Sequence, residues 1–401
     1  MWVMMAASAG VMAQKEGFGY KFYGQVRTDL FYNSRSNSET VDGLFYMYPK
    51  DVAPDADGKD LNAKPDGNFY TLYTRLGVNV TGPTLGKAKT SAKVEVDFRG
   101  SGTTYSLFRI RHVYFNLDWG KSALLVGQTW HPLYGDVAPE ILNLNMGAPY
   151  QPFSRAPQVR YRFTNKNFKL TAAAIWQSQY LSVGPSSNKA GEVATVKSQS
   201  FMKNGCLPEF YLGMDYNRPG LLAGAGVHVS SMSPRTESKY NDNIYKVSER
   251  VTGVSAEAHV KYVHRFLLAA KSVLGSNLTQ TSTIGGYGIT CTDSRTGEQE
   301  YTPLRVSHTW VNMMYGSKFR GGVFAGYLKN LGASKSVGTG TNIDQLNTLG
   351  AELTYNRPNW KFGAEYTWTG AWYGDYTDKA RVTNTHLVKN NRIVLTALFQ
   401  F

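Results

Sequence analysis

The last twelve residues of the chain, Asn390 to Phe401, decide the fold; they read NNRIVLTALFQF. Apolar side chains occupy every second position from Ile393 to the final Phe401, while the other phase contains the polar residues Arg392, Thr396 and Gln400. This period of two predicts a β-strand with two unlike faces. Chain ends usually fray, so a strand that runs to an aromatic last residue is expected to be tied down by its neighbours.

This ending resembles the final strand of the outer-membrane β-barrels of Gram-negative bacteria, whose terminal Phe is recognised by the assembly machinery. No apolar run in the chain reaches the ~18 residues that a transmembrane helix needs. A membrane barrel has this property, because each strand carries polar residues on its inner face. The aromatic content of 13%, with 26 Tyr, suits the girdles of such a barrel. On composition alone, a soluble all-β protein is an equal alternative.

The same alternation recurs along the chain. It is clearest in Lys87–Phe98, where Ala92, Val94 and Val96 alternate with charged residues in a pattern too polar for the core of a sandwich. Sixteen strands are predicted: Tyr20–Asn33, Phe69–Thr81, Lys87–Phe98, Phe108–Asp118, Ser122–Gln128, Gln158–Phe163, Phe168–Trp176, Glu209–Tyr216, Leu221–Ser230, Val251–Tyr262, Phe266–Leu274, Leu304–Tyr315, Gly321–Lys329, Leu346–Tyr355, Trp360–Trp368 and the terminal strand.

The connections between these strands alternate in length. Eight long loops alternate with seven short turns; the long loops include 34–68, 177–207, 276–302 and the segment from Trp368 to about Leu387. Both chain ends fall on the side of the barrel that carries the short turns. Bacterial membrane barrels have this arrangement, with an even strand number, short periplasmic turns and long outer loops. The predicted fold class is therefore all-β, a sixteen-stranded antiparallel transmembrane β-barrel.

The first thirteen residues are apolar and end in Val11-Met12-Ala13, which is typical of a secretory signal cleaved after Ala13, although its basic beginning is missing. We expect residues 1–13 to be the rest of a signal peptide and 14–401 to be a single barrel domain. The two cysteines, Cys206 and Cys291, fall in predicted loops. The sequence is compatible both with a disulfide between them and with two free thiols.

The net charge of +14 indicates what the chain attracts. Nucleic-acid binding would require basic residues clustered on one face, whereas here they are scattered singly along alternating strands. An electropositive lumen that attracts anions fits this pattern better. No nucleic-acid partner is expected.

Sixteen strands enclose an aqueous channel, so function depends on what narrows it. The third long connection, about Thr129–Pro157, mixes Trp130, Tyr134 and Leu142 with few charges and is expected to fold inward. Strand number and loop position resemble the general porins, whose third loop forms the constriction. That resemblance implies a homotrimer in the outer membrane, surrounded by lipid and lipopolysaccharide.

A more specific resemblance is carried by residues 109–115, which read RIRHVYF, and residues 124–130, which read LLVGQTW. These segments resemble the DcaP-like porins, trimeric channels associated with dicarboxylates and other small anions. The resemblance implies a passive, anion-preferring channel whose narrowest part is lined by arginines. By strict alternation Arg109 and Arg111 point outward with Val113 and Phe115, unless they face a neighbouring subunit or follow a bulge.

The candidate pore-lining residues come from the polar phase of the strands and from the inward loop. Arg160 and Arg162 are the best case, because Val159, Tyr161 and Phe163 take the other face. On the loop, Asp136 and Glu140 are expected to face the basic wall and set a transverse field. Alternatively, the arginines pin the loop or anchor the barrel ends. The predicted constriction set is Arg27, Arg75, Lys93, Arg160, Arg162, Arg392, Asp136, Glu140 and Arg155, with Lys271 as a further lumen cation.

Several carboxylates also fall in the inward phase, namely Glu95, Asp97, Glu257, Glu352 and Glu365. The net charge of the pore therefore cannot be read from the total of +14. An enzyme would need a framed nucleophile or base, but the seven histidines are dispersed without any motif, and no cofactor or metal site is expected. The alternatives to a channel are a surface receptor or adhesin, or a barrel enzyme, acting through the long loops.

Overall fold

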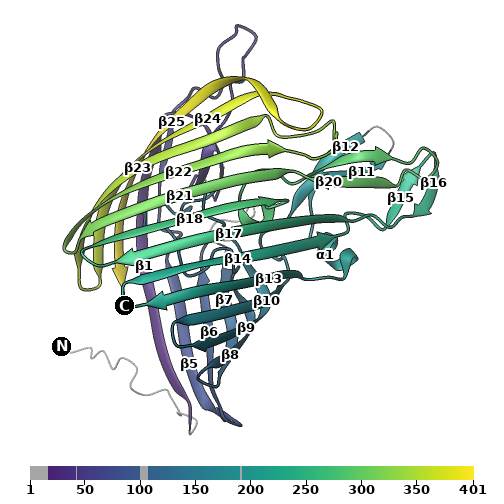
Figure 1. Ribbon diagram of the computed structural model, residues 1–401. Coiled ribbons are helices and arrows are strands. Elements are labelled where there is room, and N and C mark those ends of the chain that lie inside the picture. Colours follow the sequence, from purple (N-terminus) through teal and green to yellow (C-terminus); the bar gives the residue numbers. More distant parts are fainter. Residues whose placement is uncertain (1–16, 42, 100–106, 190–191) are drawn as a thin grey trace, which may run out of the picture.

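The computed structural model describes residues 17–41, 43–99, 107–189 and 192–401 (Figure 1). The expected signal segment, 1–13, lies outside these residues. Among the residues described, no helix is long and apolar enough to cross a membrane.

Sixteen strands of the described chain form one closed antiparallel barrel, each paired with the next (Figure 1), as predicted. They are β1 (Gly19–Asn33), β5 (Arg75–Leu85), β6 (Ala88–Asp97), β7 (Arg109–Asp118), β8 (Ser122–Trp130), β9 (Arg155–Asn165), β10 (Phe168–Ile175), β13 (Glu209–Arg218), β14 (Leu221–Met232), β17 (Val251–Val263), β18 (Phe266–Ser276), β21 (Arg305–Gly316), β22 (Phe319–Gly332), β23 (Ile343–Arg357), β24 (Trp360–Tyr376) and β25 (Val382–Gln400).

The barrel closes between β1 and β25, in a register that pairs Gln25 with Gln400. The last residue takes part in the closure: the N–H of Gly24 donates to the carbonyl oxygen of Phe401 at 2.9 Å, and the N–H of Phe401 donates back at 3.1 Å. The Phe401 ring also lies over Gly24, where an added Cβ would come within 2.5 Å of the ring and 2.8 Å of the Arg75 carbonyl oxygen. Only glycine fits between the terminal ring and the neighbouring strand.

The predicted second strand, Phe69–Thr81, is interrupted. A short strand, β4 (Asp66–Tyr70), and β5 pair in turn with β1, and a turn between them closes with the Thr74 N–H donating to the Thr71 carbonyl at 3.1 Å. The interruption directs both Leu72 and Tyr73 into the barrel, where they are buried. Strict alternation would place Leu72 on the outward face together with Leu76, but the interruption changes the phase, and a period of two cannot reveal such a bulge.

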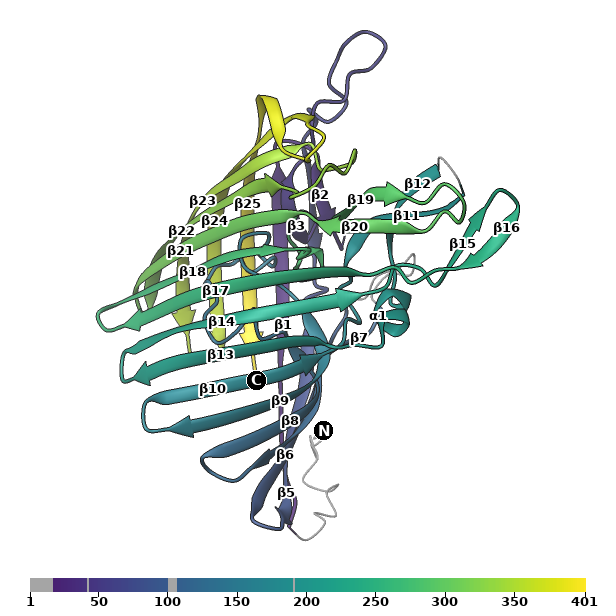
Figure 2. The same cartoon turned by 45° about the vertical axis from the view of Figure 1, so that its right-hand side comes forward.

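The long loops contain further structure that alternation did not predict. Four hairpins lie in them: β2 (Asn37–Thr40) with β3 (Phe45–Pro49), β11 (Val183–Lys189) with β12 (Glu192–Lys197), β15 (Glu237–Tyr240) with β16 (Asn243–Lys246), and β19 (Tyr287–Thr292) with β20 (Gln299–Pro303). The last three extend together beyond the barrel on one side, near the short helix α1 (Ser200–Gly205) (Figure 2).

Other predicted loops are extensions of barrel strands. The segment from Trp368 to Leu387 is mostly strand, since β24 continues to Tyr376 and β25 begins at Val382. The hairpins are short two-stranded pairs, and their buried side chains, such as Tyr46 and Tyr287, are too few to form an alternating apolar phase, which explains why the pattern missed them. Cys291 lies in β19 and Cys206 follows α1; both are exposed free thiols.

The outer wall of the barrel is apolar. Large side chains of the outward phase, such as Phe22, Leu76, Val254 and Leu353, are 44–64% exposed, and most of the barrel strands carry such exposed apolar side chains. A soluble monomer rarely exposes an apolar surface of this extent, so it must be covered by a second apolar phase.

The closure of the barrel supplies a first test. Replacing Gly24 by Val would force its side chain against the Phe401 ring and the Arg75 backbone, and overpacking of this kind costs ~1–3 kcal/mol. We expect the refolded G24V protein to show a smaller heat-resistant folded fraction on gel electrophoresis than the parent.

The matched control is Gly321→Ala on β22, where an added Cβ would come no closer than 3.8 Å to the Glu352 carbonyl oxygen. Equal folded fractions for G24V and G321A would show that the terminal ring does not restrain the closure.

Candidate functional site

The connection between β8 and β9, residues 131–154, folds into the barrel as predicted; we refer to it as the inward loop. It packs on the inner face of β18 to β24, where Leu133, Val137 and Tyr150 join Trp310 and Phe324 in one buried apolar cluster. Two hydrogen bonds fix this contact: the Tyr150 hydroxyl lies 2.8 Å from Thr348 Oγ1, and Trp310 Nε1 donates to Gln151 Oε1 at 2.8 Å. The wall under the loop is thus apolar rather than polar.

The first residue of the inward loop, His131, belongs to a buried hydrogen-bond network. Its Nε2 lies 3.1 Å from Glu209 Oε2, and His228 Nε2 lies 3.3 Å from the same oxygen. The other oxygen of Glu209 accepts from Gln177 at 2.6 Å and from Gln280 at 3.2 Å. The network joins the start of the loop to β13 and β14.

This His–Glu–His trio has ligand types that metals use. However, His131 Nδ1 accepts a hydrogen bond from the Leu133 N–H at 3.1 Å, so its proton lies on Nε2, which donates to Glu209. Burial holds the pKa of the His131 imidazole below its ordinary value, which favours this neutral form. The geometry is that of a hydrogen-bonded anchor rather than of a metal site.

Basic side chains hold the inward loop by its backbone. Lys271, which is 2% exposed, donates to the carbonyl oxygens of Leu133 at 2.8 Å and Tyr134 at 2.6 Å. Arg27 donates to the Leu142 carbonyl at 2.5 Å and forms an ion pair with Asp29 at 2.7 Å. The structure therefore places both predicted lumen cations against the loop.

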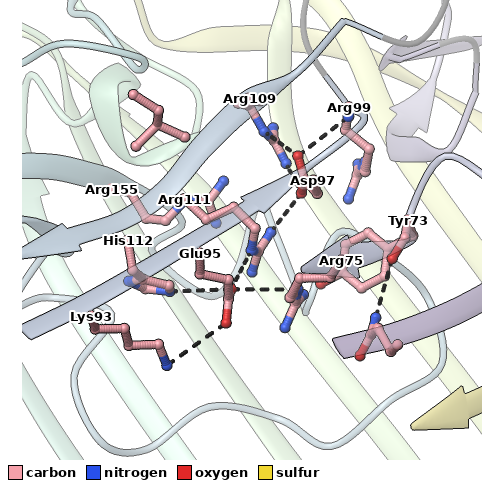
Figure 3. A network of polar contacts seen from close by, with 12 residues as sticks. Tyr73, Arg75, Lys93, Glu95, Asp97, Arg99, Arg109, Arg111, His112 and Arg155 are labelled. Atoms are coloured by element: carbon pink, nitrogen blue, oxygen red, sulfur yellow. Dashed lines mark hydrogen bonds and ion pairs between the residues drawn. The ribbon is translucent and has the colours of Figure 1, made fainter. Parts of the chain in front are cut away.

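On the opposite side of the lumen, β5 to β9 carry an arginine cluster, which we define as Arg75, Arg99, Arg109, Arg111 and Arg155 (Figure 3). Two acids hold it together. Asp97 pairs with Arg109 at 2.6 Å and Arg111 at 2.9 Å; Glu95 pairs with Arg111 at 2.7 Å and Arg75 at 3.4 Å. Lys93 lies 3.7 Å from Glu95, so the cations outnumber the acids.

A β-bulge in β7 creates this cluster. The register pairs Glu95 with His112 and Val96 with Ile110, which leaves Arg111 as the extra residue. Arg111 is consequently buried at 2% exposure inside the barrel, while Ile110 is outward and 50% exposed. Strict alternation, which predicted Arg109 and Arg111 to face outward, was wrong, and the alternative of a bulge is confirmed. The adjacent polar residues Arg111 and His112 are the sequence signal of the change of phase.

Aromatic rings lie against the guanidinium groups of the cluster. The Tyr73 ring has the guanidinium carbons of Arg75, Arg99 and Arg111 at 4.9, 5.0 and 5.5 Å from its centroid. Trp130 stacks on Tyr134 with centroids 3.9 Å apart and has Arg155 4.6 Å from its ring centroid. Cation–π contacts of this kind compensate partly for the loss of water around buried arginines.

Several nitrogens of the cluster have no hydrogen-bond partner among the described residues. They are Nε of Arg75, Nε of Arg99, and both Nε and Nη1 of Arg155. Arg99 and Arg155 are at most 1% exposed. Guanidinium donors that remain unpaired in a buried site favour the approach of an anion.

The two acids of the inward loop are paired with cations in the structure. Asp136 contacts Lys169 at 2.5 Å and Arg162 at 3.8 Å. Burial alone would raise the pKa of the Asp136 carboxyl, but these cations outweigh it and hold that pKa below its ordinary value. Glu140 contacts Arg320 at 2.6 Å and Lys261 at 3.4 Å.

The remaining predicted residues lie apart from the arginine cluster. Arg160 donates to Gln158 at 2.8 Å and also to the Trp130 carbonyl oxygen. Arg392 is buried at 2% exposure, donates to Asn33 at 3.0 Å and to the Gly43 carbonyl at 2.9 Å, and so holds the first long loop. Of the predicted set, the structure brings Arg75, Lys93 and Arg155 together. Sequence reasoning did not select Tyr73 and Arg99 for the site.

The comparisons with known proteins concern the fold. The chain is similar to the outer membrane channel DcaP of Acinetobacter baumannii, with 19% identity over 96% of this chain and 98% of that chain and a TM-score of 0.66. OmpT of Vibrio cholerae (13% identity; 97% and 99% covered; TM-score 0.58) and the anion-selective porin from Comamonas acidovorans (10%; 96% and 100%; 0.54) are also similar. At these identities the likeness shows a shared fold, which is the fold expected from the resemblance to DcaP-like porins.

Comparisons by sequence gave no match to a protein-family model or to a curated protein.

The ion pairs of the arginine cluster supply a second test. Asp97 is fully buried, and replacing it by Ala leaves Arg109 without a counter-charge and Arg111 with Glu95 alone, a loss that costs ~3–5 kcal/mol in a buried pair. We expect D97A to unfold at clearly lower guanidinium concentration than the parent in detergent micelles, as followed by tryptophan fluorescence.

The control is Asp57→Ala, which removes an exposed ion pair with Lys59 at 3.9 Å. Such a pair contributes ~0–1 kcal/mol, so the D57A midpoint should stay near that of the parent. A D97A midpoint equal to that of D57A would contradict a structural role for the acid.

Proposed function

We propose that the protein is a passive diffusion channel of the outer membrane of a Gram-negative bacterium and that it prefers small anions. The observation that carries the proposal is the arginine cluster, whose cations exceed its acids beside a loop that crosses the lumen. Cations in a confined aqueous space raise the local concentration of anions. The planar fork of arginine also matches the geometry of a carboxylate.

The barrel and its outer wall support the location. A closed sheet leaves no unpaired strand edge, which is the condition for β-structure in a membrane. The apolar outward phase provides the lipid-facing surface, with lipid and lipopolysaccharide as its surroundings. In this proposal residues 1–13 direct export and 14–401 form a single barrel domain.

Solved proteins of the same fold support the activity and assembly. DcaP is described as an outer membrane channel, and the Comamonas acidovorans protein as an anion-selective porin. The Vibrio cholerae OmpT is described in a trimer form. We propose a homotrimer for this chain as well, which chemical cross-linking of the purified protein in mild detergent would reveal.

Ion selectivity in planar bilayers tests the proposed function. The purified protein should open stable channels, and the reversal potential in a salt gradient should shift toward the anion limit. The shift should weaken at high salt, because the Debye length falls to ~3 Å at 1 M. Absence of openings would contradict a channel; cation preference would contradict the anion preference while retaining the channel.

The arginine cluster should determine the selectivity. The double variant Arg99→Gln and Arg155→Gln removes the two arginines with unpaired buried donors, and we expect its anion-to-cation permeability ratio to fall about fivefold, the equivalent of ~1 kcal/mol. The control variant Lys121→Gln and Lys166→Gln removes the same charge from two exposed turns. An equal effect of both variants would show that net charge, and not the cluster, sets the selectivity.

A further inference from the structure

Leu142, at the far end of the inward loop, is held through both polar groups of its backbone. Its N–H donates to Glu352 Oε2 at 2.8 Å and to Glu365 Oε2 at 2.6 Å. Its carbonyl oxygen accepts from Arg27 Nη2 at 2.5 Å. Three barrel strands, β23, β24 and β1, therefore restrain the backbone of a single loop residue.

The side chain of Leu142 is fixed as well. It is 3% exposed and lies on Gly363 of β24, where an added Cβ would come within 2.6 Å of Leu142 Cδ1. Because Gly363 has no side chain, it leaves the space that the Leu142 side chain occupies. Backbone and side chain together fix the position of the loop tip, and so the width of the passage beside it.

The two acids that hold the tip are cross-strand neighbours, since Glu352 pairs with Glu365 in the register of β23 and β24. Glu365 also accepts from the Asn143 N–H at 2.9 Å and from the Thr367 hydroxyl at 3.0 Å. Both side chains line a cavity of about 20 Å³, which has room for about one water molecule. Glu365 is buried at 5% exposure and Glu352 is half-buried, so the pair lies in a confined space.

No basic side chain among the described residues forms an ion pair with either acid. Lys361 acts on Glu352, and Arg392 on Glu365, only at longer range. Arg27 is bound to Asp29 and to the Leu142 carbonyl, while Arg320 and Lys261 pair with Glu140. Two neighbouring carboxyl groups in a confined space without a paired counter-charge do not both ionise at neutral pH, because like charges repel strongly there.

We propose that Glu352 and Glu365 share one proton and act as positioning residues for the constriction. In that state both acids accept from the Leu142 N–H and hold the loop tip on the wall. Loss of the proton drives the carboxylates apart; Glu352, the less buried of the two, turns away and the tip loses part of its anchor. The inference rests on the proposed channel function, because the position of the tip matters only if solutes pass it.

The conductance of the channel across pH tests the proposal. The parent should conduct steadily up to neutral pH and then show a step to a larger or noisier conductance at alkaline pH. Glu352→Gln keeps an acceptor oxygen but cannot add a second charge, so its profile should lack the step. The double variant Glu352→Ala and Glu365→Ala should show the noisy state at all pH values.

The control is Asp293→Asn in an exposed loop, which should keep the parent profile. A parent profile without the step, or the same step in E352Q, would overturn the proposal.

Hydrogen exchange gives a readout that does not require channel activity. In folded protein, the peptide containing Leu142 and Asn143 should be protected near neutral pH and lose protection in alkaline solution, after correction for the intrinsic exchange rate. E352Q should keep its protection in the alkaline range. If this exchange transition occurs but no channel openings are seen, the proposed channel function is contradicted and the proposal for Glu352 and Glu365 is supported. If channel openings are seen but the exchange transition is absent, the channel function is supported and the proposal for the two acids is contradicted.

Discussion

Backbone hydrogen bonding between β1 and β25 is the constraint on which the rest of the structure depends. It closes the sheet, and the last residue, Phe401, completes the pairing with Gly24. A closed sheet of this size has an interior too wide for its own side chains to fill. The inward loop therefore has space inside the barrel, and its own polar groups must find partners there because a buried backbone group without one is costly.

The inner wall of the barrel has two different surfaces, one apolar and one charged. Under the loop, β18 to β24 present large apolar side chains such as Trp310 and Leu346, together with a few polar groups placed for the loop backbone. On β5 to β9 the wall carries the arginine cluster. The inward loop packs on the apolar wall, and its Tyr134 and Phe153 reach the Trp130 and Arg155 side of the arginine cluster. The inward loop thus contacts both surfaces.

Local departures from regular strand geometry put charge into the lumen. The bulge at Arg111 turns two arginines inward, and the break between β4 and β5 brings Tyr73 to meet them. A bulge changes the face on which every following residue lies, so a one-residue change of register relocates a whole set of side chains. Glu95 and Asp97 then bridge these arginines and compensate part of their charge. The bulge in β7 and the break between β4 and β5 direct their side chains to the same part of the barrel interior.

The sequence by itself determined the architecture. The alternation that ends at Phe401, the sixteen strands and the regular change between long and short connections all follow from side chains that face either lipid or water, a local property that a period of two records. It also indicated an inward third loop, because residues such as Leu142 are too apolar for a solvent loop.

Only the tertiary structure decided which charged residues meet. Arg392 and Arg27, inward by phase, are bound to loops, whereas Arg109 and Arg111, outward by phase, lie inside the barrel in the arginine cluster. The hairpins of the outer loops are short and bury only a few side chains, such as Tyr46 and Tyr287, so they leave no periodic signal. Bulges, loop anchors and ion pairs depend on contacts between residues far apart in the chain, and a single-strand pattern contains no information about those contacts.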